Sequence, residues 1–421
     1  MPLPSFNASV GGSAPPALQA WAVRSAVALG VDAVRFRDSA PSPEARAAAE
    51  SLRIPLMEGA DDAASVLCVP SLPSPPWLRR LLPPAETNLG SAAMEAAFAP
   101  WAGPGAESPV GLFSAALARY RVPMGFDHGV LLTQRLQAAA AEERIADARL
   151  APADAGGAEP PALDIPLLAE GPGVSFSALD PDGGWRLAMR SLREALLPAF
   201  LGTRLADDGE TLRILVSNRR REPLQAWAHW RVVRTDGFLL DEGGVPFAIP
   251  PRSSAEVGSL PLGGLIRHCS AGRILVWAGI ESDSGERLFH RCVLLRPPRL
   301  LALQDPAIAV ETEAVPGRSA KGSPAWRRSF RVLFPGHDDE TETRRDGGHW
   351  FRVTLTAMAP ALGVLLSAPG LSGLHFGDND FDLESEWPHE VLVRSERPLT
   401  VQAFRRALRV ESLFDTYVED R

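Results

Sequence analysis

Lysine is almost missing from this 421-residue sequence: Lys321 is the only one, and arginine supplies the remaining positive charge. Acidic residues outnumber basic ones, so the formal net charge is −8 at pH 7. Electrostatic binding to a nucleic-acid backbone requires a basic face, and this charge balance argues against one. The sequence therefore predicts no nucleic-acid partner.

Cysteine is also scarce. The three cysteines, Cys68, Cys269 and Cys292, lack the spacing of metal ligands, and an odd number cannot all pair in a disulfide framework. The sequence predicts a reducing compartment and no metal site.

Long apolar runs and targeting signals are missing too. No run approaches the roughly 18 to 20 apolar residues that span a bilayer. Residues Met1 to Phe6 have neither the basic start nor the apolar centre of a signal peptide. We expect no membrane association and a cytoplasmic location. Phosphate-binding glycine motifs and a nucleophile elbow are likewise not found, so no cofactor is expected.

The first part of the chain alternates helix-like and strand-like patterns. We expect a helix over Ala17 to Leu29, a strand over Ala33 to Phe36, a helix over Ser42 to Leu52, and a strand over Ile54 to Met57. A strand, helix and strand in this order imply a parallel pair. Further along, an apolar face at helical spacing predicts a helix over Trp185 to Phe200.

After about residue 200 the pattern changes to short alternating runs, which predict the strands of two antiparallel sandwiches. These runs lie near residues 212–216, 230–233, 273–277, 288–294, 351–356, 362–367 and 390–394. Trp227, Trp230 and Trp277 lie in the strand-like segments of the first sandwich. We expect them to fill a sandwich core; the alternative is that they stack on sugars.

The expected fold class is multidomain, α/β plus all-β. Residues 1–200 form a barrel-like α/β domain, 201–298 an immunoglobulin-like β-sandwich, and 299–421 a second such sandwich. Residues 317–348 are charged and poor in large apolar side chains, so we expect a mobile insertion there.

Several segments resemble family 2 glycoside hydrolases of the β-mannosidase type, and they occur in that family's order. Ser65-Val66-Leu67-Cys68-Val69-Pro70-Ser71 is similar to the segment that carries the nucleophilic glutamate. Leu303-Gln304-Asp305-Pro306 resembles the strap between the last two domains, and Phe376-Gly377-Asp378-Asn379-Asp380-Phe381-Asp382-Leu383 resembles a turn of the C-terminal domain. The alternating aspartates of that turn hint at a calcium loop, but Leu383 replaces the expected glycine, so a structural turn is predicted.

The resemblance also implies that the catalytic parts have degenerated. In a gapless alignment the nucleophile falls on Val66, and no Asn-Glu dipeptide is present to supply the acid/base residue. The sugar-facing positions of another segment fall on Ile165, Leu168, Ala169 and Gly171. About 185 residues precede the first sandwich, whereas a complete (β/α)₈ barrel takes about 250. We therefore expect an incomplete barrel remnant.

Three functions remain open from the sequence. The first is a non-catalytic relative that binds a glycan or another protein of carbohydrate metabolism. The second is an active glycosidase with relocated carboxylates, for which Glu58, Asp61 (or Asp62) and Glu170 are candidates. The third is an interaction subunit whose open sheet edge is covered by a partner. The sequence defines neither ligand nor oligomeric state, nor whether the missing barrel strands were lost or lie upstream of Met1.

Overall fold

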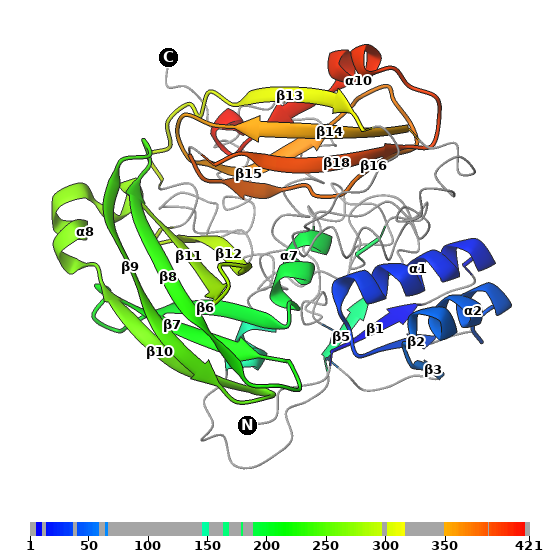
Figure 1. Cartoon of the computed structure of the whole chain (residues 1–421), viewed down its shortest axis with the longest axis horizontal. Helices are drawn as coiled ribbons and strands as arrows, with labels where there is room; N and C mark the ends of the chain where they lie inside the picture. Colours follow the sequence, from blue (N-terminus) through cyan, green and yellow to red (C-terminus); the bar gives the residue numbers. More distant parts are fainter. Residues whose placement is uncertain are drawn as a thin grey trace, which may run out of the picture.

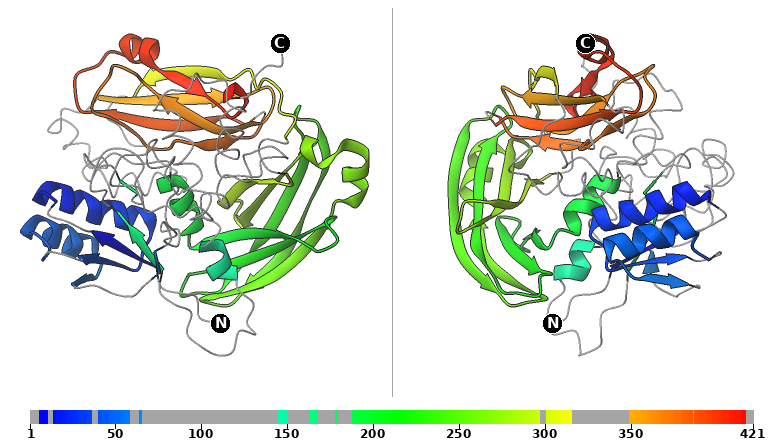
Figure 2. Two further views of the ribbon diagram at one scale, coloured as in Figure 1. Left: turned by 180° about the vertical axis from the view of Figure 1, so that it is seen from behind. Right: turned by 45° about the vertical axis from the view of Figure 1, so that its right-hand side comes forward.

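The computed structural model describes residues 6–10, 14–36, 40–58, 64–65, 145–150, 163–167, 178–179, 188–296, 301–315, 349–385 and 387–416. They form an α/β unit followed by two β-sandwiches, as the sequence predicts. Helix α7 (Ala188–Ala195) lies between all three parts (Figure 1), and Figure 2 shows the same arrangement from two other directions. No helix in the described ranges is long and apolar enough to cross a membrane.

The α/β unit is built on a parallel sheet with strand order β3-β2-β1-β5-β4. Its strands are β1 (Phe6–Val10), β2 (Ala33–Phe36), β3 (Leu56–Glu58), β4 (Ala64–Ser65) and β5 (Leu163–Pro166). The last strand in the chain, β5, pairs with the first, β1. Among the described strands β3 and β4 are the two edges, so these five do not close into a ring.

Helices α1 (Pro16–Leu29) and α2 (Pro43–Leu52) lie side by side in this unit. Helix α1 ends at Gly30, whose φ of 79° is left-handed, a conformation that glycine adopts at little cost. Helix α2 begins after Ser42, whose hydroxyl accepts a hydrogen bond from the Ala45 N–H at 3.2 Å. Both predicted helices and the predicted parallel pair of β2 and β3 are confirmed.

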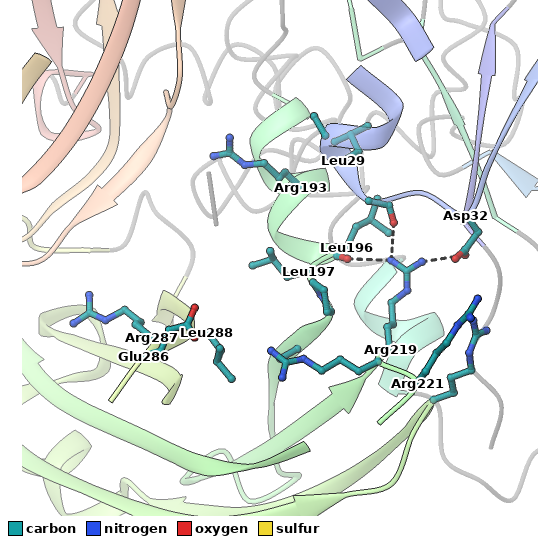
Figure 3. A pocket seen from close by; sticks show the side chains of 16 residues that line it. Leu29, Asp32, Arg193, Leu196, Leu197, Arg219, Arg221, Glu286, Arg287 and Leu288 are labelled. Carbon is teal, nitrogen blue, oxygen red and sulfur yellow. Dashed lines mark hydrogen bonds and ion pairs between the residues drawn. The ribbon is translucent and has the colours of Figure 1, made fainter. Parts of the chain in front are cut away.

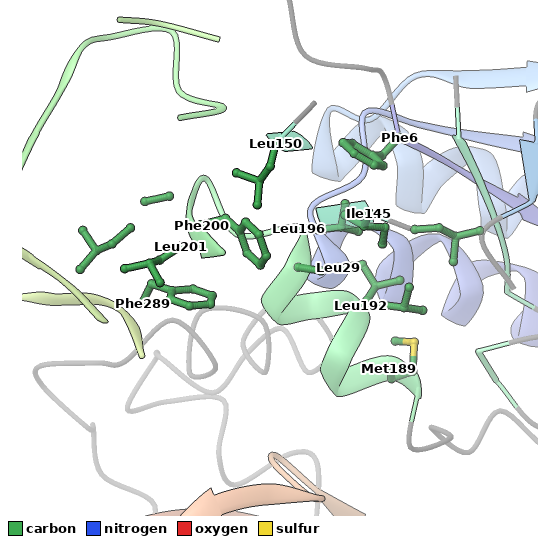
Figure 4. Packing of buried hydrophobic residues seen from close by; sticks show 14 of the residues in the cluster. Phe6, Leu29, Ile145, Leu150, Met189, Leu192, Leu196, Phe200, Leu201 and Phe289 are labelled. Atoms are coloured by element: carbon green, nitrogen blue, oxygen red, sulfur yellow. The ribbon is translucent and has the colours of Figure 1, made fainter. Parts of the chain in front are cut away.

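One continuous apolar core joins the α/β unit to the first sandwich through α7 (Figure 4). Met189 and Leu192 of α7, together with Leu196 just after its last residue, are buried on the face that the sequence predicts. The predicted extension of this helix to Phe200 is wrong, because α7 ends at Ala195 and Phe200 belongs to the next strand. Pro198 explains the difference, since proline has no N–H for the helical hydrogen bond.

Arg149 is fully buried beside the end of α7. Its guanidinium donates hydrogen bonds to the carbonyl oxygens of Ala195 and Leu197, at 2.5 and 2.8 Å, and to the hydroxyl of Ser217 at 3.2 Å. A buried charge is tolerated only where its donors are satisfied. Arg149 therefore ties residues 145–150 to both α7 and the first sandwich.

The first sandwich contains two antiparallel sheets, β10-β7-β6 and β12-β11-β8-β9. Its strands are β6 (Ala199–Leu205), β7 (Thr211–Asn218), β8 (Leu224–Arg234), β9 (Leu239–Ile249), β10 (Ser253–Pro261), β11 (Ile274–Ser282) and β12 (Arg287–Leu294), and α8 (Gly263–Cys269) connects β10 to β11. Val216, Ala228 and Val276 are completely buried between the sheets. The predicted strands β7, β8, β11 and β12 are confirmed.

The second sandwich pairs the sheets β13-β14-β18-β16 and β17-β15-β19. Its elements are β13 (Ala309–Ala314), β14 (His349–Thr356), β15 (Ala361–Ser367), β16 (Leu374–Phe376), β17 (Phe381–Leu383), β18 (His389–Ser395), α10 (Val401–Ala407) and β19 (Arg409–Glu411). Phe351, Phe381 and Phe404 fill its core. The expected insertion at 317–348 lies outside the described residues, and the exact domain boundaries remain a prediction.

A buried ion pair joins α7 to the second sandwich. Arg193 Nη2 lies 2.8 Å from Asp378 Oδ1, and Arg193 Nη1 donates to the Gly377 carbonyl at 3.2 Å. Burial alone would raise the pKa of Asp378, but the charges of Arg190 and Arg193 and a hydrogen bond from His389 outweigh it, so this pKa lies well below its usual value. Asp378 is therefore ionised in the folded protein.

The rest of the aspartate-rich turn also serves structure. Asn379 accepts the Leu366 N–H at 2.7 Å and donates to the Leu366 carbonyl at 2.9 Å, which imitates the pairing of a strand. Asp382 accepts the Gly363 N–H at 2.9 Å. These contacts confirm the expected structural turn.

Glu384 forms a second contact between the sandwiches. Its carboxylate is buried and pairs with Arg231 of β8 and with His290 Nε2 of β12, the latter at 3.4 Å. Burial would raise the pKa of Glu384, but the hydrogen bond and charge of His290 and the charge of Arg231 lower it overall. This side chain fixes the second sandwich against the outer face of sheet β12-β11-β8-β9.

Asp378→Asn should lower the free energy of unfolding by about 3 kcal/mol at pH 7, because it leaves Arg193 buried without its carboxylate. Since the pKa of Asp378 is lower in the folded state, its contribution is fully present above the unfolded pKa of about 4 and decreases progressively as the pH falls from there through the lower folded-state pKa. Urea denaturation at pH 7 and pH 3 measures both effects.

Glu58→Gln provides the matched control, because it removes one carboxylate from an exposed ion pair and should cost less than about 1 kcal/mol. Equal losses from the two substitutions would show that the Arg193–Asp378 contact does not hold the parts together.

Candidate functional site

Glu58 is the last residue of β3, at the carboxyl end of a parallel strand, where barrel enzymes carry catalytic groups. Its Oε1 lies 3.3 Å from Arg46 Nη2, and both side chains are 59% exposed. This is a solvent-screened surface pair at an edge of the described sheet. The other sequence candidates, Asp61, Asp62 and Glu170, lie outside the described residues, as does Val66.

Ile165 occupies a core position. It lies on β5 opposite Ala8 of β1, and its side chain is completely buried. In the gapless alignment this residue replaces an aromatic side chain that faces the sugar. Leu167, two residues further, is equally buried. Leu168, Ala169 and Gly171 lie outside the described residues.

The three tryptophans of the first sandwich have different surroundings. Trp277 is buried between the two sandwiches, and Trp230 packs against the main core. Trp227 is 47% exposed on β8, so the expectation that all three fill a core is wrong for this residue. Trp227 is the one whose ring is accessible to a ligand.

Two exposed indoles lie beside an acidic and a basic residue of neighbouring strands. In the strand register, Trp227 lies opposite Glu281 of β11, and Glu281 lies opposite Arg287 of β12. The guanidinium of Arg287 lies 5.6 Å from the ring centroid of Trp387, which comes from the second sandwich and is 51% exposed. We call Trp227, Glu281, Arg287 and Trp387 the tryptophan platform. Exposed indoles offer an apolar face together with a polar edge.

A pocket of about 560 Å³ lies next to Arg287. Figure 3 shows that its walls come from the end of α1, the end of α7 and the first sandwich. Six arginines line it, against the two carboxylates Asp32 and Glu286. The arginines are Arg193, Arg219, Arg220, Arg221, Arg252 and Arg287.

Two of these arginines have structural partners. Arg193 pairs with Asp378. Arg219 donates to the carbonyl oxygens of Gly30 and Leu196, at 3.1 and 3.0 Å, and lies 3.0 Å from Asp32 Oδ2 (Figure 3). Burial lowers the pKa of Arg219, and the charge of Asp32 opposes this effect.

Arg220, Arg221 and Arg252 also line the pocket, but unlike Arg193 and Arg219 they are exposed residues. In the described part of the chain no carboxylate lies within ion-pair distance of their guanidinium groups. In the sequence, Arg220 and Arg221 belong to the run Arg219-Arg220-Arg221. A run of this kind is typical of a solvated surface, so the pattern alone does not predict a binding site.

Family models match both sandwiches. Residues 210–299 match the mannosidase Ig/CBM-like domain, and residues 338–416 match the mannosidase Ig-fold domain. No curated protein matches the sequence.

Solved structures of glycoside hydrolases share the fold. A β-D-mannosidase from Dictyoglomus thermophilum is 14% identical with a TM-score of 0.53, and the match covers 73% of this chain and 32% of that one. The exo-chitosanase CsxA from Amycolatopsis orientalis is 11% identical with a TM-score of 0.56, covering 98% of this chain and 63% of that one. The chain thus spans less than two thirds of the length of either protein. It resembles the C-terminal half of family 2 glycoside hydrolases of the β-mannosidase type, and its two sandwiches match the models of mannosidase immunoglobulin-like domains.

Proposed function

We propose that this chain is a non-catalytic relative of the β-mannosidase-type hydrolases and that it binds a glycan. The observation that carries the proposal is Ile165, a completely buried core residue at a position where the resemblance calls for a sugar-facing aromatic ring. Together with Val66 at the nucleophile position in the alignment, it indicates that two active-site segments have lost their chemistry.

A retaining glycosidase needs two carboxylates about 5 to 5.5 Å apart, one to attack and one to donate a proton. Glu58 is the carboxylate that the described residues place at the carboxyl edge of the sheet, and it is engaged with Arg46. A valine at position 66 cannot form a covalent intermediate. These features support binding without hydrolysis.

The tryptophan platform supports a glycan as the ligand. Sugar rings have apolar faces that stack on indoles, and the charged groups of Glu281 and Arg287 can hydrogen-bond hydroxyl groups between the two rings. Trp227 lies in the segment that matches the mannosidase Ig/CBM-like domain, whereas Trp387 lies in the segment that matches the Ig-fold domain. The ligand would therefore contact both sandwiches.

An assembly role is the second candidate. Strands β3 and β4 are the edges of the described parallel sheet, and strand edges in folded proteins are normally covered or kept short. Another protein of carbohydrate metabolism could cover one of these edges.

The chain should not hydrolyse p-nitrophenyl β-mannoside above the rate of a heat-denatured sample, because Val66 replaces the nucleophilic carboxylate in the alignment. Release of p-nitrophenolate, followed over hours at several pH values, measures this. Hydrolysis that disappears in Glu58→Gln, Asp61→Asn or Glu170→Gln would instead establish an active enzyme with relocated carboxylates.

Trp227→Ala and Trp387→Ala should each weaken glycan binding about 5- to 10-fold, which corresponds to about 1 kcal/mol of lost ring contact. A glycan array identifies the ligand, and isothermal titration then compares the variants. Phe238→Ala is the matched control, since Phe238 is an exposed aromatic residue outside the platform. Unchanged affinity in both tryptophan variants would contradict the assignment of the platform.

A further inference from the structure

We propose that the arginine-lined pocket binds an anionic substituent of a saccharide, a carboxylate, phosphate ester or sulfate, through Arg220, Arg221 and Arg252. The saccharide part of this inference rests on the proposed function. The anion part rests on the pocket itself.

The pocket has the size and position of a ligand site. Its volume of about 560 Å³ falls within the roughly 300 to 1,000 Å³ that is usual for small-molecule pockets. It lies where the α/β unit, α7 and the first sandwich meet, and such junctions are common places for ligands. One charged sugar unit can fit into this space.

The charges of the lining are not balanced. Asp32 pairs with Arg219, and Asp378 pairs with Arg193. This leaves four lining arginines, Arg220, Arg221, Arg252 and Arg287, against the single carboxylate of Glu286. Like charges held close together repel one another, and in a pocket with apolar walls they focus a positive potential. An anion would relieve this repulsion.

A buried amide holds together the turns that carry these arginines. Asn218 is completely buried, and its Nδ2 donates to the carbonyl oxygens of Glu222, Ile249 and Pro250 at 2.9, 3.2 and 3.1 Å. Its Oδ1 accepts the Arg220 N–H at 2.9 Å. One side chain therefore fastens the turn that carries Arg220 and Arg221 to the turn that carries Arg252.

Arg252 itself has a strained backbone. Its φ of 49° is left-handed, a conformation that is unfavourable for a residue other than glycine. Its N–H donates to the Arg220 carbonyl at 3.3 Å, which keeps the two residues adjacent. The fold thus brings two positively charged residues onto neighbouring hydrogen-bonded turns.

Guanidinium groups suit the proposed ligand. Their planar donors match the oxygen atoms of carboxylates, phosphates and sulfates in a two-point geometry. Three such groups on fixed turns can surround one anionic substituent. Neutral sugars offer no comparable acceptor.

Arg287 connects the pocket to the tryptophan platform. It lines the pocket and also lies over the ring of Trp387. A saccharide on the platform can therefore extend a charged unit into the pocket. This continuity favours an acidic saccharide over a free inorganic anion.

Isothermal titration of the full chain with trigalacturonate, neutral mannotriose and inorganic phosphate tests the proposal. Trigalacturonate should bind at least 10-fold more tightly than mannotriose, and added salt should weaken its binding. The double variant Arg220→Ala/Arg252→Ala should lower the affinity for trigalacturonate at least 10-fold and leave mannotriose binding unchanged. Arg405→Ala, which removes an exposed arginine on α10, is the matched control.

Each outcome decides one point. Equal affinity for the acidic and neutral trisaccharides, or binding of trigalacturonate that survives in the double variant, would overturn the anion site. Binding of phosphate without trigalacturonate would overturn the saccharide assignment. The proposed function fails separately, if no glycan is bound or if the tryptophan variants bind like the wild type. Circular dichroism checks that the double variant is folded. If it is unfolded, Arg221→Ala alone replaces it in the titration.

Discussion

The ion pair between Arg193 and Asp378 constrains the whole molecule. It fastens α7 to the second sandwich, while the apolar face of α7 packs against the α/β unit and the first sandwich. Helix α7 has only eight residues, and an isolated helix of that length is not stable in water. It persists because Met189, Leu192 and Leu196 are buried in the main core while Arg193 reaches the second sandwich. A buried ion pair tolerates little misalignment, since either charge alone would be strongly unfavourable. The α/β unit and both sandwiches are therefore positioned by one short helix.

The ends of two helices explain why arginine accumulates near the pocket. Carbonyl groups at a helix carboxyl end are unsatisfied and carry partial negative charge. Arg219 binds Gly30 at the end of α1 and Leu196 at the end of α7, and Arg149 binds Ala195 and Leu197 nearby. These two side chains occupy the helix ends. Within the described ranges no carbonyl or carboxylate oxygen accepts a hydrogen bond from the guanidinium groups of Arg220, Arg221 and Arg252, which is why we propose a separate role for them.

Much of the fold could be predicted from local patterns, because the parallel pair of β2 and β3 and strands such as β7 and β11 have clear periodicity. Strand β9 was not predicted, because Gly243, Gly244 and Pro246 interrupt its alternation of apolar and polar residues. The end of α7 was predictable from Pro198. The opposite environments of Trp227 and Trp230 were predictable as well, because residues three apart on a strand face opposite sides. The pocket was not, since its walls come from residues as distant as Gly30 and Arg287.

The placement of Trp227 and Trp387 on different sandwiches has a mechanical consequence. Glu384 of the second sandwich is held by Arg231 and His290 of the first, and its carbonyl accepts the N–H of Trp387 at 3.4 Å, so the backbone that carries one ring is tied to the sandwich that carries the other. The other ring belongs to the first. The Glu384 contacts therefore limit how far the two indoles can shift relative to each other. A ligand that contacts both rings would strengthen the contact between the two sandwiches.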